Sequence, residues 1–181
     1  PRAGIVHRLD KDTTGLMVVA LTIEAQTHLV NQLQARSVSR HYEALVQGGV
    51  DKPGVVNEEM GRHPTVRTKM AVLKQGGKQA ITEYSPVAQF DGFTHVRLKL
   101  QTGRTHQIRV HMAHIGHPLL GDQVYGKALD KARVRQLPWL DELNQFPRQA
   151  LHAARLGLVH PNTGEDVEWR VPLEDSFLSL L

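Results

Sequence analysis

The sequence predicts an α+β fold in which most strands pair antiparallel. Segments with a strand pattern outnumber those with a helical pattern, and Asp91-Gly92 between two of them is a strong hairpin signal. Beyond this hairpin, Phe93–Gln101 alternates between apolar and basic side chains, as a half-buried strand does. The apolar face carries Val96, Leu98 and Leu100, and the other face carries Arg97 and Lys99. No internal repeat or domain boundary interrupts the 181 residues, so we expect one domain.

The N-terminal part predicts a polar loop, a strand and a helix, in that order. The loop His7–Gly15 leads into the short apolar run Leu16–Ala20, which we expect to be a buried strand. Thr22 is the expected N-cap of a helix over about Glu24–Arg36, whose apolar residues recur at helical spacing. A further strand is predicted over Ser39–Gly48, where glycines end it.

The middle of the chain alternates irregular segments with strands. Residues 55–69 are basic and show no regular pattern, so we expect no helix or strand there. Strands are predicted over Met70–Leu73 and Ala80–Phe90, with a turn at Gln75–Lys78 between them.

A second helix is predicted to begin after Thr105, its expected N-cap, and to end at Gly116. Ile108, Met112 and Ile115 recur at helical spacing and form its expected buried stripe.

The C-terminal part predicts two more strands. Residues 127–148 are charged and contain two prolines, so we expect a variable excursion with a short helix. Strands are predicted over His152–Val159 and Val167–Val171, around a turn at residues 161–164. The tail Leu173–Leu181 is expected to form a last helical turn or two.

Composition narrows the classes of function. The net charge of +4 and pI near 9.6 favour a polyanionic partner such as nucleic acid, although charge alone is a weak signal. The sequence has no cysteine, which excludes disulfides, thiolate catalysis and cysteine zinc sites in this chain and fits a reducing compartment. No apolar run approaches the ~18 residues of a membrane span.

The loop His7–Gly15 concentrates charged groups in a short segment. Asp10 lies between Arg8 and Lys11, whose positive charges favour an ionised carboxylate, the form that a nucleophile or proton acceptor needs. Asp12 invites an acid–base pair with Asp10, but an Asp two residues away is more often a turn or cap residue.

A second cluster lies at the start of the predicted second helix. Arg104, Thr105 and His106 follow a glycine at a helix N-terminus, an arrangement that can bind an anion such as phosphate. Arg109 lies one turn further, off the apolar stripe, where it can reach a carboxylate or simply face solvent. Tyr42, on a predicted strand, reads by itself as ordinary half-buried packing.

His111, His114 and His117 raise the alternative of a metal site. Residues three apart share a helix face, but His117 follows the expected helix end, and no HExxH motif accompanies the three. A metal-dependent hydrolase is therefore the weakest hypothesis. It is more common for such histidines to be hydrogen-bonded within the fold or to face RNA.

Three motifs, in this order, resemble those of the RluA-type pseudouridine synthases, and most closely the large-subunit ribosomal RNA enzymes of the RluD kind. They are HRLDKDTTGLMVVA, RHYEALVQG and LQTGRTHQIRVHMAHIGHPLLGDQVYG, and the similarity covers the whole chain. The resemblance implies a mixed, mainly antiparallel sheet with flanking helices and an active-site cleft across it. It also implies a cytoplasmic enzyme that isomerises uridine in RNA to pseudouridine without a metal or an organic cofactor.

The resemblance further assigns roles to individual residues. Asp10 is implied to be the catalytic aspartate, Tyr42 the active-site tyrosine and Arg109 the arginine that pairs with the aspartate. Arg8 is expected to contact the RNA where the target base leaves its stack. Arg104, Thr105 and His106 are expected to be structural or to contact phosphate.

Members of this family begin the catalytic domain some tens of residues earlier, often after a small RNA-binding domain of the ribosomal-protein S4 kind. Residues 1–181 are therefore expected to be a single catalytic domain in the form of a fragment, without the upstream strands and any such RNA-binding domain. The alternative function is a basic RNA-binding module of the same fold that performs no catalysis.

Overall fold

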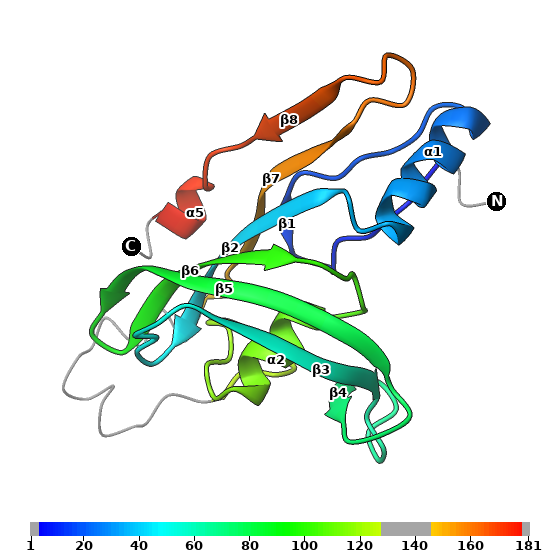
Figure 1. The fold of residues 1–181 in the computed structure, drawn as a ribbon. Helices are drawn as coiled ribbons and strands as arrows, with labels where there is room; N and C mark the ends of the chain where they lie inside the picture. The colour runs from blue at the N-terminus through cyan, green and yellow to red at the C-terminus, as the bar shows by residue number, and fades with distance from the viewer. Residues whose placement is uncertain (1–3, 128–145, 179–181) are drawn as a thin grey trace.

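A computed structural model describes residues 4–127 and 146–178 of the chain. Within these residues, an eight-stranded sheet has the order β1-β7-β2-β6-β5-β3-β4, with β8 paired to β7 (Figure 1). Only β1 and β7 pair parallel among the described strands, which confirms an α+β fold with a mixed, mainly antiparallel sheet. The strands are β1 (Thr14–Gly15), β2 (Ser39–Gln47), β3 (Gly54–Arg62), β4 (Met70–Leu73), β5 (Lys78–Phe90), β6 (Phe93–Leu100), β7 (Leu151–Val159) and β8 (Asp166–Arg170); the helices are α1 (Ile23–Gln34), α2 (Gln107–His114) and α5 (Asp175–Leu178).

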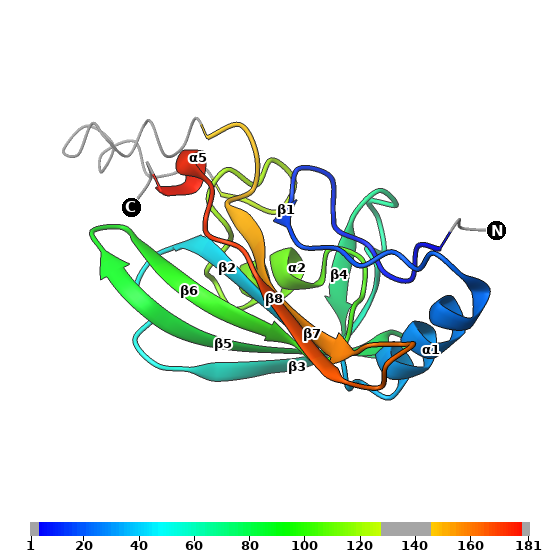
Figure 2. The same ribbon diagram turned by 90° about the horizontal axis from the view of Figure 1, so that it is seen from above.

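The main core lies between the centre of the sheet and α2. Val46 on β2, Leu98 on β6 and Met112 on α2 are buried in one apolar cluster. The hairpin predicted at Asp91-Gly92 joins β5 to β6, and Gly92 has a φ of 98°, which favours glycine. Figure 2 shows α2 and the N-terminal segment on the same side of the sheet, so a site between them has the sheet as its floor.

The predicted strand Leu16–Ala20 is wrong, because the regular strand there is only the two-residue β1. The run is held by single contacts. The backbone N–H of Leu16 donates to the carbonyl of Ala153, and Val19 forms an isolated bridge with Ile5. Met17 and Val19 are exposed while Leu16 and Val18 pack on the core, so the apolar run packs one side against β7 and β8 without joining the ladder.

Helix α1 confirms the expected helix and its cap. The Thr22 hydroxyl accepts a hydrogen bond from the backbone N–H of Ala25 at 3.2 Å, which satisfies one of the free donors of the first turn. Leu29 is buried, and the side chain of Gln32 bonds both the N–H and the carbonyl of Val159, which ties the helix to β7.

The expectation of irregular structure over residues 55–69 is wrong in its first half, where β3 pairs with β4 and β5. Only Val56 and Met60 are buried in this strand, and its other side chains are partly or fully exposed. Two buried residues four apart do not produce the alternation by which a strand is recognised, because its outer positions are polar on both faces.

Helix α2 is confirmed, but its predicted cap is wrong. The N-cap is His106, in a left-handed conformation with a φ of 57°, and no side chain caps the helix. The Gln107 side chain instead accepts a hydrogen bond from the backbone N–H of Arg104 at 2.9 Å and donates to the carbonyl of Ile81 at 3.0 Å. This buried amide fixes the turn before α2 against β5.

The C-terminal strands and the short helix α5 agree with expectation to within one residue at the strand ends. The predicted excursion over 127–148 lies mostly outside the described residues, as do residues 179–181 of the tail. No helix in the described part of the chain is long and apolar enough to cross a membrane.

Candidate active site

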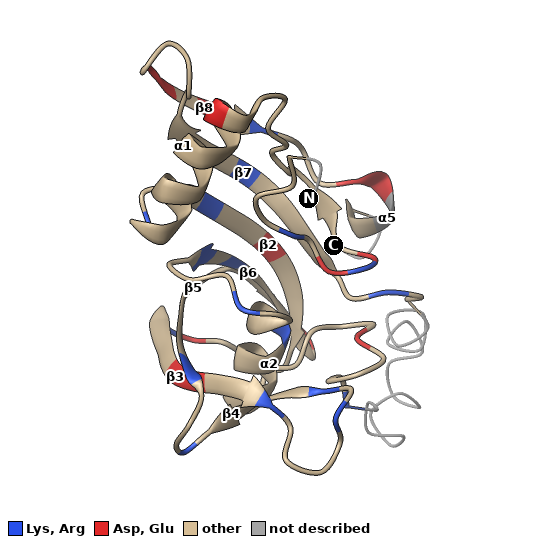
Figure 3. Cartoon of the chain, turned by 90° about the vertical axis from the view of Figure 1, so that its right-hand side faces the viewer, with Lys and Arg blue, Asp and Glu red and all other residues tan. Residues whose placement is uncertain are grey.

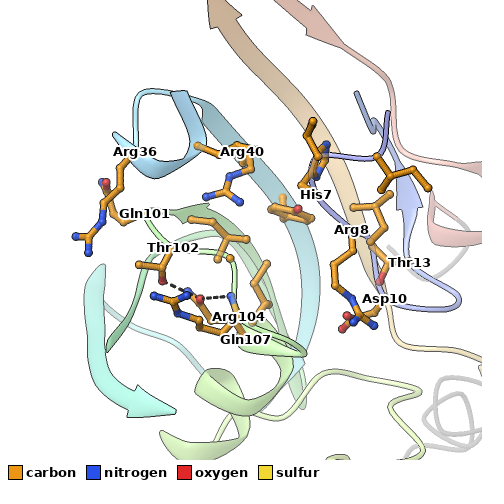
Figure 4. A pocket seen from close by; sticks show the side chains of 18 of the residues that line it. His7, Arg8, Asp10, Thr13, Arg36, Arg40, Gln101, Thr102, Arg104 and Gln107 are labelled. Atoms are coloured by element: carbon orange, nitrogen blue, oxygen red, sulfur yellow. Dashed lines mark hydrogen bonds between the residues drawn. The ribbon is translucent and has the colours of Figure 1, made fainter. Parts of the chain in front are cut away.

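A cleft of about 750 Å³ opens between the N-terminal loop, β2 and the turn before α2 (Figure 4). Asp10, Arg8 and Thr13 line it from the loop, and Arg40 and Tyr42 from β2. The view that faces the N-terminal segment and α2 shows basic positions on β2 and beside α2 (Figure 3).

The loop that carries Asp10 is held from the far end of the chain. The Gln149 side chain donates to the carbonyl of Lys11 at 2.6 Å and to the Thr13 hydroxyl at 3.1 Å. Within the loop, the backbone N–H of Thr13 donates to the carbonyl of Asp10 at 3.0 Å. Asp12 is exposed with a φ of 68°, which agrees with a turn residue.

Strand β1 fixes this loop to the sheet. Gly15 pairs with Ala153 of β7, and its φ of 101° favours glycine. A Cβ at Gly15 would lie 2.2 Å from the carbonyl oxygen of Ala153. The Thr14 hydroxyl also shares a hydrogen bond of 2.8 Å with Nδ1 of His152, so side chain and backbone anchor the loop together.

Arg109 joins Asp10 to a second carboxylate, Asp122. The guanidinium binds Asp122 through two bonds, Nε to Oδ2 at 2.7 Å and Nη2 to Oδ1 at 2.8 Å. Its Nη1 lies 3.4 Å from Oδ2 of Asp10. Bidentate pairing fixes the plane of the guanidinium. Arg109 therefore presents a defined nitrogen to the Asp10 carboxylate.

Asp122 is itself held in place. Its Oδ1 accepts hydrogen bonds from the backbone N–H groups of Val124 at 2.9 Å and Tyr125 at 3.0 Å. Burial by itself would raise the pKa of Asp122, but the bonds from Arg109 and from these two N–H groups outweigh it and lower the pKa. Asp122 is thus a buried anion that anchors Arg109.

Tyr125 completes the surroundings of Arg109. Its ring lies 5.1 Å from the guanidinium carbon of Arg109, in cation–π contact. Its hydroxyl accepts a hydrogen bond from the backbone N–H of Met70 and shares another, of 2.8 Å, with Nδ1 of His106. The turn before α2 and the strand β4 are therefore both linked to Arg109 through one tyrosine.

Tyr42 lies in the floor of the cleft with only 6% of its surface exposed. Burial raises the pKa of its hydroxyl to about 12, and the nearby charge of Arg40 acts in the opposite direction. Tyr42 therefore remains a neutral phenol at neutral pH.

The four residues expected to contact RNA occupy different places. Arg8 and Arg104 are exposed and line the cleft, with Nε of Arg104 bonded to the carbonyl of Gln79 at 3.1 Å. His106 caps α2 and is bonded to Tyr125. Thr105 is half-buried in the same turn and lies outside the lining of the cleft.

The family profile described as RNA pseudouridylate synthase matches residues 1–114, which include the loop of Asp10, the strand of Tyr42 and the arginine between the two carboxylates. The chain belongs to the RNA pseudouridylate synthase family. It is 56% identical over all 181 residues to the ribosomal large subunit pseudouridine synthase D of Haemophilus influenzae. The identity is 57% with the protein of that name from Pseudomonas aeruginosa and 52% with that from Escherichia coli K12, also over the full chain. The chain spans 55–56% of the length of these three relatives.

Two solved structures of human proteins are similar in fold to this chain. Human RNA Pseudouridylate Synthase Domain Containing 1 matches 92% of this chain and 67% of its own at a TM-score of 0.73 and 29% identity. Human RNA Pseudouridylate Synthase Domain Containing 4 matches 96% of this chain and 72% of its own at a TM-score of 0.78, and its 24% identity supports the fold alone.

The three histidines of the metal alternative do not form a cluster of ligands in the described part of the chain. His111 is fully buried and shares a hydrogen bond of 2.9 Å with Thr82, whereas His114 is exposed. Nδ1 of His117 is bonded to the carbonyl of Gln47 at 3.0 Å. No group of three or more potential metal ligands occurs among the described residues. Within residues 4–127 and 146–178, the metal ligands that the hydrolase hypothesis requires are therefore not brought together.

Asp122, Tyr125 and Arg40 were not predicted from the sequence to be site residues. A signal for Asp122 existed: a guanidinium has five N–H donors, more than Asp10 alone can accept from, so a buried Arg109 requires a second acceptor. Arg40 lies two residues before Tyr42 and so shares its face of β2, which makes it a cleft residue wherever Tyr42 is one.

Proposed function

We propose that this chain is the catalytic part of an RNA pseudouridine synthase that isomerises specific uridines of large-subunit ribosomal RNA. The observation that supports this most directly is the Asp10 carboxylate, which lines the cleft and lies 3.4 Å from Arg109. Both residues stand in the segment that the family profile matches. The substrate follows from the relatives' names, and it sets the expected place of action in the cytoplasm.

The reaction requires the uracil to leave its stack and turn inside a pocket. The bond between C1′ and N1 breaks, the base rotates, and a bond forms between C1′ and C5. C5 then loses its proton while N1 gains one. An enzyme that acts on a base in RNA must first flip that base out. A cleft of about 750 Å³ is in the usual range for a ligand of that size.

In this proposal Asp10 performs the chemistry and Arg109 orients it. An ionised carboxylate beside the sugar can attack C1′ or accept a sugar proton, and both routes require its negative charge and a fixed position. Arg109 supplies a positive charge at 3.4 Å, and its plane is set by Asp122.

Tyr42 is proposed to pack against the uracil and to take part in the last proton transfer. As a neutral phenol on the floor of the cleft, it presents an aromatic face for stacking and a hydroxyl that can donate or accept a hydrogen bond. Arg8, exposed at the rim two residues before Asp10, is proposed to contact the RNA at the position that the flipped base leaves.

The decisive experiment replaces Asp10→Asn and uses Asp12→Asn as its matched control. Both changes remove one charge from the same loop, and Asn tolerates the positive φ of Asp12. Pseudouridine is mapped in ribosomal RNA from a strain that lacks the protein and is complemented with each variant. We expect Asp10→Asn to abolish the modification and Asp12→Asn to retain it. Near-normal modification with Asp10→Asn would disprove the assignment, and RNA binding without any product from the unaltered protein would favour a non-catalytic module.

A further inference from the structure

Arg40 is a buried arginine without a hydrogen-bonding or ionic partner among the described residues. Only 7% of its surface is exposed, and its guanidinium makes no hydrogen bond or ion pair with any described residue. Its Nε is fully buried and unsatisfied. Figure 4 shows the Arg40 side chain pointing into the cleft, on the side away from Asp10.

Such an arrangement is costly for the free protein. A buried charge normally has a counter-ion, because its desolvation costs several kcal/mol that only a partner offsets. Burial lowers the pKa of Arg40, which reflects that cost. The contrast with Arg109, equally buried but paired with two carboxylates, shows that the fold provides acceptors where an arginine needs them.

The surroundings of Arg40 are shaped for the guanidinium and are positively charged. Gly103 passes so close that a Cβ there would lie 2.6 Å from Nη1 of Arg40, so glycine leaves the space that the side chain occupies. Arg36 and Arg104 line the same part of the cleft. Asp10 is the only carboxylate among the described lining residues, and it lies at the opposite side.

We propose that Arg40, together with Arg36 and Arg104, forms a phosphate-binding subsite of the cleft. It holds a phosphodiester of the RNA backbone next to the flipped uridine. The ligand class follows from charge: three arginines that line one part of the cleft match an anion with several acceptor oxygens better than a neutral carbonyl. Because Arg40 and Tyr42 share one face of β2, the bound phosphate lies beside the expected place of the uracil. The identity of the anion as RNA rests on the proposed function.

The first test measures RNA binding by Arg40→Met as a function of salt. Met has a similar length and adapts to the buried space without charge. We expect roughly 10- to 100-fold weaker binding of a single-stranded uridine-containing RNA at low salt. The slope of log affinity against log salt should fall by about 0.7, the value for one phosphate contact on a single strand. Arg170→Met, which removes the same charge from an exposed, ion-paired position on β8, is the matched control and should leave the slope unchanged.

The second measurement separates ligand binding from a structural role. Removal of an unpaired buried charge should leave the melting temperature of the free protein unchanged or raise it. A structural arginine would instead lower the melting temperature on substitution. Weaker RNA binding with equal or higher stability thus supports the subsite, whereas an unchanged salt slope overturns it.

Arg36→Asn keeps the proposal testable if Arg40→Met fails to fold. Arg36 is exposed with a φ of 60°, which Asn adopts readily, so this variant loses charge without backbone strain. Its salt slope should also fall, and an unchanged slope in a folded Arg36→Asn overturns the proposal. Pseudouridine formation is scored separately: if the unaltered protein forms no product but the slopes fall, the subsite stands and the proposed reaction fails.

Discussion

Arg109 contacts two carboxylates, one fully buried and one at the cleft. Asp122, fully buried, fixes the guanidinium through two bonds, and Asp10, at the cleft, is met by the remaining nitrogen. The rigid pair of Arg109 and Asp122 therefore sets the position of the Asp10 carboxylate. Small errors in that position are costly, because a misplacement of about 1 Å can reduce catalysis by roughly 100-fold.

Asp122→Asn tests this arrangement at the level of one residue. The change leaves the Arg109 charge buried without its bidentate partner, so the free energy of unfolding should fall by about 3–5 kcal/mol in urea titrations. Pseudouridine formation by the fraction that remains folded should fall by roughly 100-fold. Asp166→Asn, at an exposed position on β8, removes the same charge and should change stability by less than about 0.5 kcal/mol. A fully active and stable Asp122→Asn would contradict the anchoring role.

At the scale of residues, only some members of the candidate site could be predicted from the sequence. The proximity of Asp10 and Arg109 was expected from the resemblance and is found at 3.4 Å. The roles of Arg8, Arg104, Thr105 and His106 toward RNA stay predictions. Asp122 and Arg40 were not predicted, because their importance depends on burial. A Gly-Asp turn or an arginine on a strand is by itself common at a protein surface.

At the scale of elements, the shortest described strand holds the loop that carries Asp10. β1 comprises two residues, yet it attaches the loop of Asp10 to β7 in a parallel pair. The pair can form only because Gly15 lets the backbone come within contact of Ala153. The geometry of the carboxylate therefore depends on one glycine.

Gly15→Ala should separate β1 from β7. Its φ of 101° and the 2.2 Å approach of the added Cβ to the Ala153 oxygen combine strain with a clash. We expect a loss of more than about 2 kcal/mol in the free energy of unfolding and little or no pseudouridine formation.

Gly164→Ala, in the turn between β7 and β8, is the matched control. Gly164 has a φ of 73° but nothing within 4 Å of an added Cβ. Alanine at this position would therefore cause backbone strain without a steric clash. Its cost should be about 1–2 kcal/mol, with activity retained. Equal behaviour of the two alanine variants would argue against a special role for the β1–β7 contact.

Elements with one clear periodicity were predictable, and elements stabilised by their neighbours were not. The hairpin β5–β6 and the helix α1 follow from local pattern and capping. β3 forms because β4 and β5 supply ladder partners on both sides. Leu16–Ala20 remains outside the ladder because β8 pairs with β7 beyond the two positions that β1 occupies. Strand pairing over long distances is a tertiary property that a short window of sequence does not contain.

At the scale of the whole molecule, the half-buried His7 and the fully buried His111 make the free energy of unfolding depend on pH. Burial lowers the pKa of His7 and of His111 to about 4 from an ordinary value of 6.5. His7 agrees with this state, since its Nε2 accepts a hydrogen bond from the backbone N–H of Val18 and must be unprotonated. The unfolded chain binds these protons first, so stability is complete above pH 6.5 and is lost as the pH falls toward 4.

His111→Gln should flatten this dependence. Glutamine can keep the bond to Thr82 but does not titrate. The slope of the unfolding free energy between pH 6 and 4.5 should decrease by at most about 1.4 kcal/mol per pH unit, the value for one proton. Urea unfolding at a series of pH values measures this, with the exposed His114→Gln as control. A slope that does not change in His111→Gln would mean that His111 is not the titrating group.

The bond between Thr14 and His152 joins residues 138 positions apart, and it sets an order of events during synthesis. At about 5–20 residues per second, the segment with Asp10 leaves the ribosome about 7–28 seconds before β7 does. During that interval the aspartate exists without the strand that positions it. Until β7 has been made and has folded onto the loop, the growing chain therefore lacks the contacts that hold the loop of Asp10 against the sheet.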